Sequence, residues 1–239
     1  MTPLLDARAI ALPYRLARLD VSSPGGELIA LVGPNGGGKT SLLRALAQVE
    51  DASGVVLVDG EDLDRAGEAR RRRLLSFLPA SREIAWPIAV RDVIALGGAN
   101  EAEVSRWLGR FELNGLAERT VANLSTGERA RVFLARAMAT GPRLLLLDEP
   151  LSNLDPYWVL RTLELLREET VRGATLLVAL HDISLVERFD RLLLLEHGRI
   201  VGDGTASGLS NRLGALFGVE PAPKGGWQIN PLVDRRSSP

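Results

Sequence analysis

The stretch that decides the fold is Gly33-Pro34-Asn35-Gly36-Gly37-Gly38-Lys39-Thr40, followed by Ser41. It matches the pattern G-x-x-x-x-G-K-[ST], in which glycines let backbone N–H groups wrap closely around phosphate oxygens. An apolar run, Leu28–Val32, precedes the loop, and a helical pattern follows it, so the positive end of a helix faces the bound anion. We therefore predict a nucleotide site in which Lys39 reaches the β- and γ-phosphates and the Thr40 hydroxyl binds Mg²⁺.

A second element, Leu144-Leu145-Leu146-Leu147-Asp148-Glu149-Pro150, joins an apolar run to two acids. A buried strand would deliver Asp148 to the carboxyl edge of a parallel sheet, where α/β proteins bind ligands. We expect Asp148 to hold Mg²⁺ through water and Glu149 to orient or deprotonate the water that attacks the γ-phosphate. The alternative is a strand end capped by solvated acids.

Short apolar runs alternate with longer helical patterns along the rest of the chain, which predicts an α/β fold with a mainly parallel sheet flanked by helices. The expected strands are Leu28–Val32, Val55–Val58, Leu74–Leu78, Leu144–Leu147, Thr175–Leu180 and Arg191–Leu195. The expected helices are Thr40–Gln48, Val90–Leu96, Glu101–Phe111, Glu128–Thr140 and Pro156–Val171. We interpret 1–80 and 141–217 as one nucleotide-binding lobe of P-loop NTPase type, 81–140 as an inserted helical lobe, and 218–239 as a C-terminal appendage.

The composition narrows the possible functions. The 239 residues carry a net charge of -1 and include no cysteine. The charge balance argues against a nucleic-acid partner, and the lack of cysteine excludes disulfides and thiolate zinc sites. No apolar run approaches the ~20 residues that span a bilayer, and no cleavable signal is recognisable, so we expect a cytoplasmic protein.

Leu124-Ser125-Thr126-Gly127-Glu128 closely resembles the signature motif of the ATP-binding-cassette (ABC) family. The order of motifs is also similar: the phosphate loop, the signature, the acidic strand, then Ser152-Asn153-Leu154-Asp155 and His181. The resemblance implies a P-loop ATPase that uses ATP and Mg²⁺. It also implies that Ser125 and Gly127 contact ATP held by a second copy of the chain in a head-to-tail dimer. A plain capping box between Ser125 and Glu128 is the structural alternative, and both can hold.

The same resemblance to the ABC family implies roles for two further side chains. His181 follows an expected strand, and the family pattern implies that it contacts the γ-phosphate. Tyr14 is expected either to stack on adenine or to lie half-buried in the core. His197 reads as part of an exposed hairpin turn, with no functional role predicted.

The segments Leu78-Pro79-Ala80 and 85–97 look like those of importer cassettes for iron–siderophores, haem and cobalamin. This implies transmembrane permease subunits as partners and a peripheral position on the inner face of the membrane. One departure from the family pattern matters for the chemistry, because Ala80 stands where the family has a glutamine. Two alternatives stay open: a soluble ABC ATPase acting on ribosomes or chromosomes, and a single-cassette binding switch with low turnover.

Overall fold

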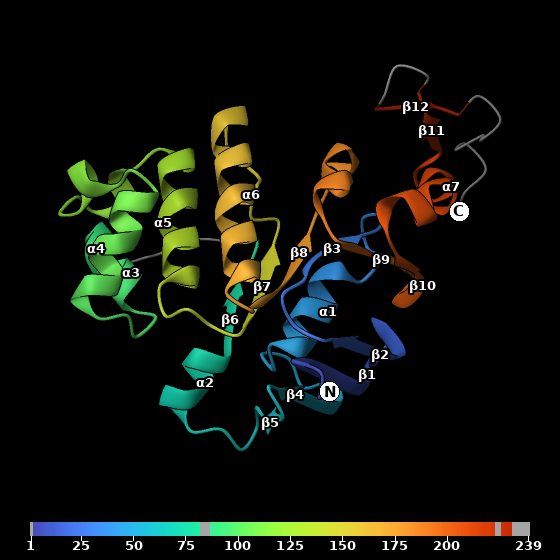
Figure 1. The fold of residues 1–239 in the computed structure, drawn as a ribbon, viewed down its shortest axis with the longest axis horizontal. Coiled ribbons are helices and arrows are strands. Elements are labelled where there is room, and N and C mark those ends of the chain that lie inside the picture. The colour runs from blue at the N-terminus through green and yellow to red at the C-terminus, as the bar shows by residue number, and fades with distance from the viewer. Residues whose placement is uncertain (1, 82–86, 223–225, 231–239) are drawn as a thin grey trace.

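In a computed structural model, which describes residues 2–81, 87–222 and 226–230, the chain forms two large sheets with helices around them and a small third sheet (Figure 1). The larger sheet has six strands in the order β10-β9-β3-β8-β7-β6. Its strands are β3 (Leu28–Val32), β6 (Leu75–Leu78), β7 (Leu144–Asp148), β8 (Thr175–Ala179), β9 (Arg191–Glu196) and β10 (Arg199–Gly204). Only the β9–β10 pair within it is antiparallel.

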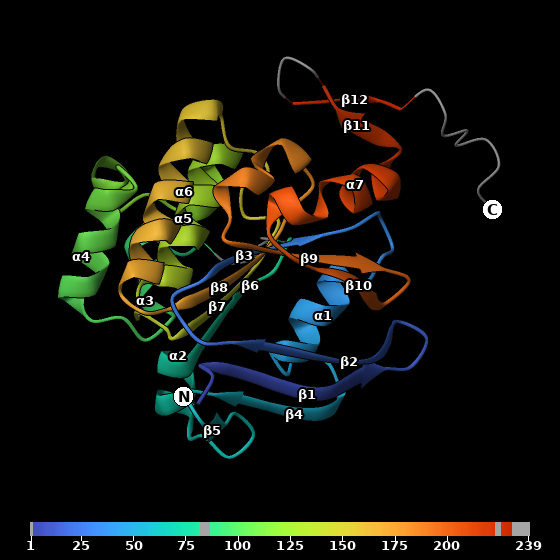
Figure 2. The same cartoon turned by 45° about the vertical axis from the view of Figure 1, so that its right-hand side comes forward.

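Two apolar cores cover opposite faces of this sheet, which is why its central strands are apolar throughout. Ala30 and Leu147 belong to the core shared with the helices α3 to α6, whereas Leu31 and Leu146 belong to the core around α1. The helix α1 (Lys39–Leu46) lies between the two sheets (Figure 2). The expectation of an α/β fold with a mainly parallel sheet is confirmed.

The second sheet is antiparallel and was not predicted. Its order is β2-β1-β4-β5, with β1 (Leu5–Leu12), β2 (Leu16–Ser23), β4 (Ser53–Val58) and β5 (Glu61–Asp62). The β1–β2 pairing shifts register after Ala7, next to Ala9, whose φ of 57° is left-handed. This irregularity interrupts the alternation of inward and outward residues and so hides the strand in the sequence.

Between β6 and β7 the described chain is helical. The segment contains α3 (Val90–Ala95), α4 (Glu101–Arg110), the short 3₁₀ turns η1 (Asn114–Leu116) and η2 (Val121–Asn123), and α5 (Thr126–Met138). These helices stand to one side of α6 (Pro156–Val171), which separates them from the centre of the sheet (Figure 1). The expected strands and helices agree with the structure within two residues at each end.

Four further elements escaped the sequence analysis in the larger lobe and at its end: α2 (Glu68–Leu74), η3 (Ile183–Arg188), β10 and α7 (Ala206–Phe217). Leu74, expected to start a strand, instead ends α2. The chain after α7 forms a small two-stranded sheet, β11 (Val219–Pro221) with β12 (Trp227–Ile229). No helix among the described residues is long and apolar enough to cross a membrane.

Candidate nucleotide site

The phosphate loop joins β3 to α1 and requires its glycines. Gly36 and Gly38 have left-handed φ values of 76° and 105°, which residues with a Cβ rarely adopt. A Cβ on Gly33 would lie 2.0 Å from the Leu195 carbonyl oxygen, so only glycine fits there. Gly38 is the N-cap of α1 and makes no side-chain cap, so the first amides of the helix are available to an anion.

Lys39 lies inside this loop, with only 7% of its surface exposed. Its Nζ donates to the carbonyl oxygens of Gly33 (2.6 Å) and Pro34 (3.1 Å). An ammonium has three donors, so one remains for a phosphate oxygen. Burial lowers the pKa of Lys39, while the carboxylates of Glu149 and Asp148 oppose that shift.

Asp148 ends β7 at the carboxyl edge of the large sheet, opposite Ala179 of β8. The side chain is almost completely buried, and burial raises its pKa. A hydrogen bond with the Thr40 side chain opposes the rise, as do the positive charges of Arg44 and Lys39. A buried carboxylate beside a hydroxyl is an oxygen donor set suited to Mg²⁺, so the residues present fit the predicted metal.

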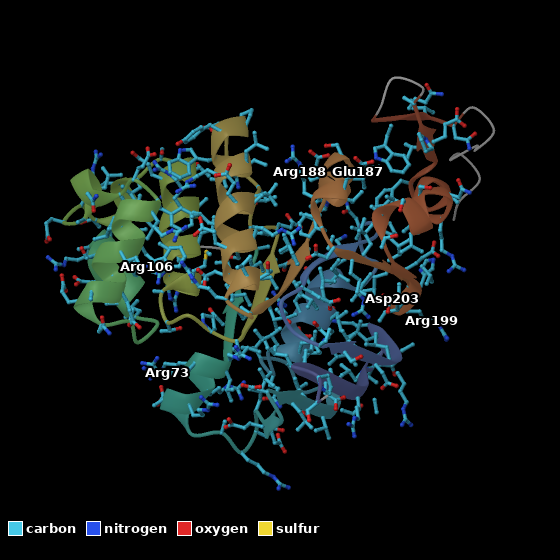
Figure 3. The ribbon with its side chains drawn as sticks, in the orientation of Figure 1. Arg73, Arg106, Glu187, Arg188, Arg199 and Asp203 are labelled. Carbon is cyan, nitrogen blue, oxygen red and sulfur yellow. The ribbon has the colours of Figure 1, made fainter. Side chains whose placement is uncertain are left out.

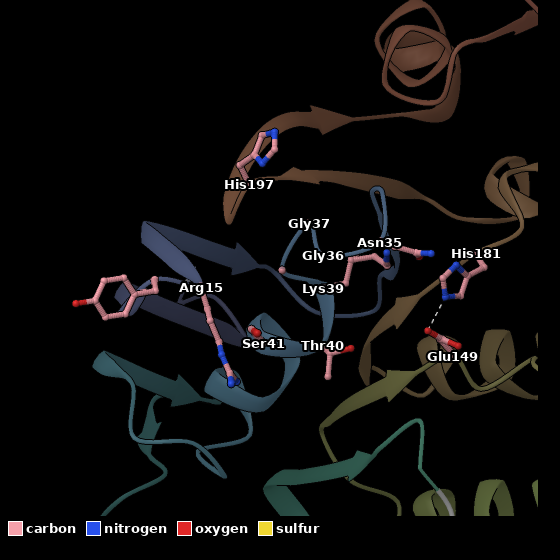
Figure 4. A pocket seen from close by; sticks show the side chains of 12 residues that line it. Arg15, Asn35, Gly36, Gly37, Lys39, Thr40, Ser41, Glu149, His181 and His197 are labelled. Atoms are coloured by element: carbon pink, nitrogen blue, oxygen red, sulfur yellow. Dashed lines mark hydrogen bonds and ion pairs between the residues drawn. The ribbon is translucent and has the colours of Figure 1, made fainter. Parts of the chain in front are cut away.

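Glu149 and His181 meet across the ends of β7 and β8. The Glu149 Oε1 lies 2.6 Å from His181 Nε2 (Figure 4). Glu149 has a left-handed φ of 52°, and its carbonyl accepts a hydrogen bond from Ser152 Oγ at 2.8 Å. The chain therefore turns sharply after Asp148 and leaves the Glu149 carboxylate partly exposed toward the phosphate loop.

The phosphate loop, Lys39, Thr40, Glu149 and His181 line one pocket of about 520 Å³. Its walls are Tyr14, Arg15, Asn35, Gly36, Gly37, Gly38, Lys39, Thr40, Ser41, Glu149, His181 and His197. Tyr14 is fully exposed, so the alternative of a half-buried core tyrosine is wrong, and stacking on adenine stays a prediction. His197 lies in the exposed β9–β10 turn, as expected, but its place on the pocket was not foreseen, and neither was that of Arg15.

Ser125 and Gly127 are not among the residues that line this pocket. Ser125 is the N-cap of α5: its Oγ accepts from the Glu128 N–H at 3.2 Å, while the Glu128 carboxylate accepts from the Ser125 N–H at 2.8 Å. The capping-box interpretation is confirmed. These hydrogen bonds lower the pKa of Glu128. Contact of Ser125 and Gly127 with a nucleotide on a second copy stays a prediction.

Ala80 follows β6, is exposed, and does not line the nucleotide pocket. Of the segment likened to importer cassettes, Ala85 and Trp86 lie outside the described residues. The described part of that segment contains α3 and ends at Gly97. A groove of about 370 Å³ opens beside it, lined in part by Leu78, Leu96, Phe133 and Arg136.

A family model described as "ABC transporter" matches residues 16–152, more than half of the chain. The chain belongs to the ABC transporter family. The ATP-binding subunits of this family are ATPases, and the chain is accordingly an ATP-binding protein of that class.

Curated relatives of this ABC protein include two hemin import ATP-binding proteins. The one from Streptomyces coelicolor is 42% identical over 203 residues, which cover 79% of this chain and 72% of the relative. The one from Pseudomonas entomophila is 38% identical and covers 88% and 90% of the two chains. A cobalamin import ATP-binding protein of Halobacterium salinarum is 34% identical over 89% of this chain and 58% of its own.

Solved structures agree on the fold. The ATP-binding subunit of an ABC transporter superposes with a TM-score of 0.79 at 26% identity, covering 89% of this chain and 94% of that chain. A dimeric ATP-binding cassette bound to ADP and Pi superposes with a TM-score of 0.75 at 22% identity, over 84% and 98% of the two chains.

Proposed function

We propose that this ABC protein is the ATP-binding and ATP-hydrolysing subunit of an importer for haem or a cobalamin-like ligand. The observation that carries the ATPase is the pocket lined by Lys39, Thr40 and the Glu149–His181 pair, with Asp148 buried beside Thr40. The importer and its ligand class rest on the hemin and cobalamin import relatives. A cassette does not touch the transported ligand in this scheme, so the ligand is the part that rests on similarity alone.

The residues divide the chemistry between them. Amides of the phosphate loop and the third Lys39 donor bind the β- and γ-phosphates, with Asn35 and Ser41 on the same wall. Thr40 and Asp148 hold Mg²⁺, which supplies positive charge to the phosphate oxygens when it is bound. Glu149 takes a proton from the attacking water. His181 orients that carboxylate through its 2.6 Å contact and presents its ring to the γ-phosphate.

A second copy of the chain would complete the site. Ser125 and Gly127 lie at the N-terminus of α5, whose positive end can meet an anion from outside, although the capping box engages the Ser125 hydroxyl and the Glu128 amide. Since these residues stand apart from the chain's own pocket, we infer that they serve ATP bound to the partner in a head-to-tail dimer.

The groove beside Ala80 is the proposed docking site of the permease on the inner face of the membrane. Apolar and polar side chains both line the groove; Leu96 is 54% exposed, and burial lowers the pKa of Arg136. No carboxylate pairs with Arg136 among the residues that the structure describes. The groove therefore suits a cytoplasmic helix of the permease that brings apolar side chains and an acidic group.

Co-purification with a many-helix membrane protein encoded beside this chain tests the proposal. Leu96→Asp should abolish the association while Mg-ATP binding persists, and Leu160→Asp, on the exposed face of α6, serves as the matched control. Lys39→Ala should weaken Mg-ATP binding by about 10²-fold or more, since it removes the mobile positive charge from the phosphates. Robust ATP binding without any membrane partner would instead favour the low-turnover binding switch, which the exposed Ala80 keeps open.

A further inference from the structure

The tip of the β9–β10 hairpin is bonded to the phosphate loop. The Gly198 N–H donates to the Gly37 carbonyl at 3.0 Å, and the Gly198 carbonyl accepts from the Ala17 N–H at 3.0 Å. A Cβ on Gly198 would lie 2.3 Å from the Arg15 carbonyl oxygen, so the close approach depends on glycine at this position. The start of β2, the phosphate loop and the hairpin therefore form one fixed unit.

This unit places two basic side chains on the nucleotide pocket. His197 lines the pocket next to Gly198, and its backbone φ of 47° is left-handed. Arg15 lines it from the other segment, and its Nη1 donates to Glu50 at 3.0 Å. Figure 4 shows Arg15 extending toward Ser41, while His197 stands at the hairpin above Gly37.

The contacts that hold the hairpin use the backbone of Gly198, not the His197 side chain. No hydrogen bond or ion pair in the described part of the chain involves the His197 imidazole. The His197 side chain therefore takes no part in the contacts that hold the hairpin on the phosphate loop. Its ring nitrogens are free to meet a ligand.

We propose that His197 and Arg15 bind the α-phosphate and ribose of the nucleotide. The proposal rests on the ATP site proposed above. Glu149 and His181 mark the end of the pocket where the γ-phosphate reacts, and Tyr14 marks the end predicted for adenine. Arg15 directly follows Tyr14, and Gly198, the residue after His197, packs against the Arg15 carbonyl. On this side of the pocket a guanidinium and an imidazole offer donors to phosphate oxygens and ribose hydroxyls.

Two variants test this without disturbing the backbone. His197→Gly keeps a residue that accepts the left-handed φ, and His197→Asn is a second choice because asparagine also tolerates it. Arg15→Gln removes the other cation. The matched controls are Arg199→Gln, in the same hairpin, and Arg18→Gln, in β2, which are both exposed and do not line the pocket.

The measurement compares Mg-ATP with inorganic pyrophosphate by calorimetry on the full chain. Each pocket variant should bind Mg-ATP about 3- to 10-fold more weakly, the effect of one partly exposed polar contact. Their affinity for inorganic pyrophosphate should stay within about two-fold of the wild type, because pyrophosphate fills only the β- and γ-positions.

Unchanged affinity for Mg-ATP in the His197 and Arg15 variants would overturn the inference and leave the proposed function standing. An equal loss for inorganic pyrophosphate would overturn the assignment to the α-phosphate and ribose. A wild-type chain that binds no Mg-ATP would overturn the proposed function, and this inference with it.

Discussion

Among the single residues of the site, Asp148 is buried at a position where burial disfavours its ionised form. Asp148 ends a strand that is buried on both faces, and burial raises its pKa despite Thr40, Arg44 and Lys39. In the nucleotide-free chain, the ionised form of Asp148 therefore lowers the free energy of unfolding. Relative to the unfolded chain, the Asp148 contribution to stability falls as the pH rises through its raised pKa.

We predict that Asp148→Asn raises the melting temperature of the nucleotide-free chain at pH 7 to 8. The expected gain is roughly 2–4 °C, the shift that about 1 kcal/mol produces in a chain of this size. The gain should shrink as the pH is lowered, because Asp148 then becomes neutral in the wild type as well. Calorimetry across pH measures it, with the exposed Glu187→Gln as a control. A variant that melts lower at pH 8 would show that the Asp148 charge is favourable in the fold.

Ala80 stands where the resemblance to the family predicts a glutamine. A methyl group cannot hydrogen-bond water or bind Mg²⁺, so one polar contact of the usual glutamine is missing. We expect the wild type to bind Mg-ATP normally and hydrolyse it slowly. Ala80→Gln should raise turnover by up to about 10²-fold, the effect of one such contact in a transition state.

Steady-state ATPase rates at saturating Mg-ATP measure the effect. Ser81→Ala is the companion variant, since Ser81 is the neighbouring hydroxyl. A fast wild type that Ala80→Gln leaves unchanged, and that Ser81→Ala slows, would mean that Ser81 fills the role of the glutamine.

At the scale of elements, one arginine connects the start of α5 with the start of α6. The Arg131 guanidinium carbon lies 4.2 Å from the centre of the Trp158 ring, and Nη1 donates to the Phe111 carbonyl at 2.6 Å. Trp158 is held in turn by Asp155, the N-cap of α6, whose Oδ1 accepts from the Trp158 N–H at 2.9 Å. The helix that begins with Ser125 and the turn that follows Glu149 are thereby fixed relative to each other.

We predict that Arg131→Lys lowers kcat by about 10-fold, because the lysine loses the planar contact with Trp158 and lets Ser125 shift. The KM for Mg-ATP should stay nearly constant, since the chain's own pocket is untouched. Arg106→Lys is the matched control, because that arginine also lies over a tryptophan, Trp107, but on α4. Equal losses of kcat in both variants would show that Arg131 stabilises the helices in general and does not specifically position Ser125.

For the whole molecule, the proposed function gives each chain two anion sites that would face different nucleotides. One is the pocket of the phosphate loop and the other is the capped start of α5. A single copy cannot bring them to the same ATP, so two copies have to pair for both to be used.

We predict that Glu149→Gln keeps Mg-ATP binding, suppresses turnover by at least about 10²-fold and accumulates an ATP-bound dimer. The amide cannot take a proton from water, so ATP persists between the two copies. Light scattering should give twice the mass of the 25.8 kDa chain with Mg-ATP and the single mass without it. Glu149→Gln combined with Lys39→Ala should stay monomeric. A monomeric Glu149→Gln at saturating Mg-ATP would contradict the dimer, and unchanged hydrolysis would contradict the role of Glu149.

The features that could be predicted from the sequence are those that depend on residues close together along the chain. The phosphate loop needs glycines at fixed spacing, buried parallel strands need unbroken apolar runs, and a capping box needs Ser125 three residues before Glu128. Each of these patterns lies within one short segment, which is why the α/β core, the family and the start of α5 could be predicted. The roles assigned to the site residues remain predictions.

Which segments, far apart along the chain, line the same pocket became visible only in the folded structure. Arg15 and His197 stand at two turns far apart in the chain, and they meet the phosphate loop because Gly198 allows the hairpin to pack on Gly37. The antiparallel sheet stayed hidden because the irregular backbone at Ala9 breaks the alternation of β1. The packing of the hairpin on the phosphate loop and the register of β1 depend on contacts between segments. Such contacts produce no periodic pattern in the sequence.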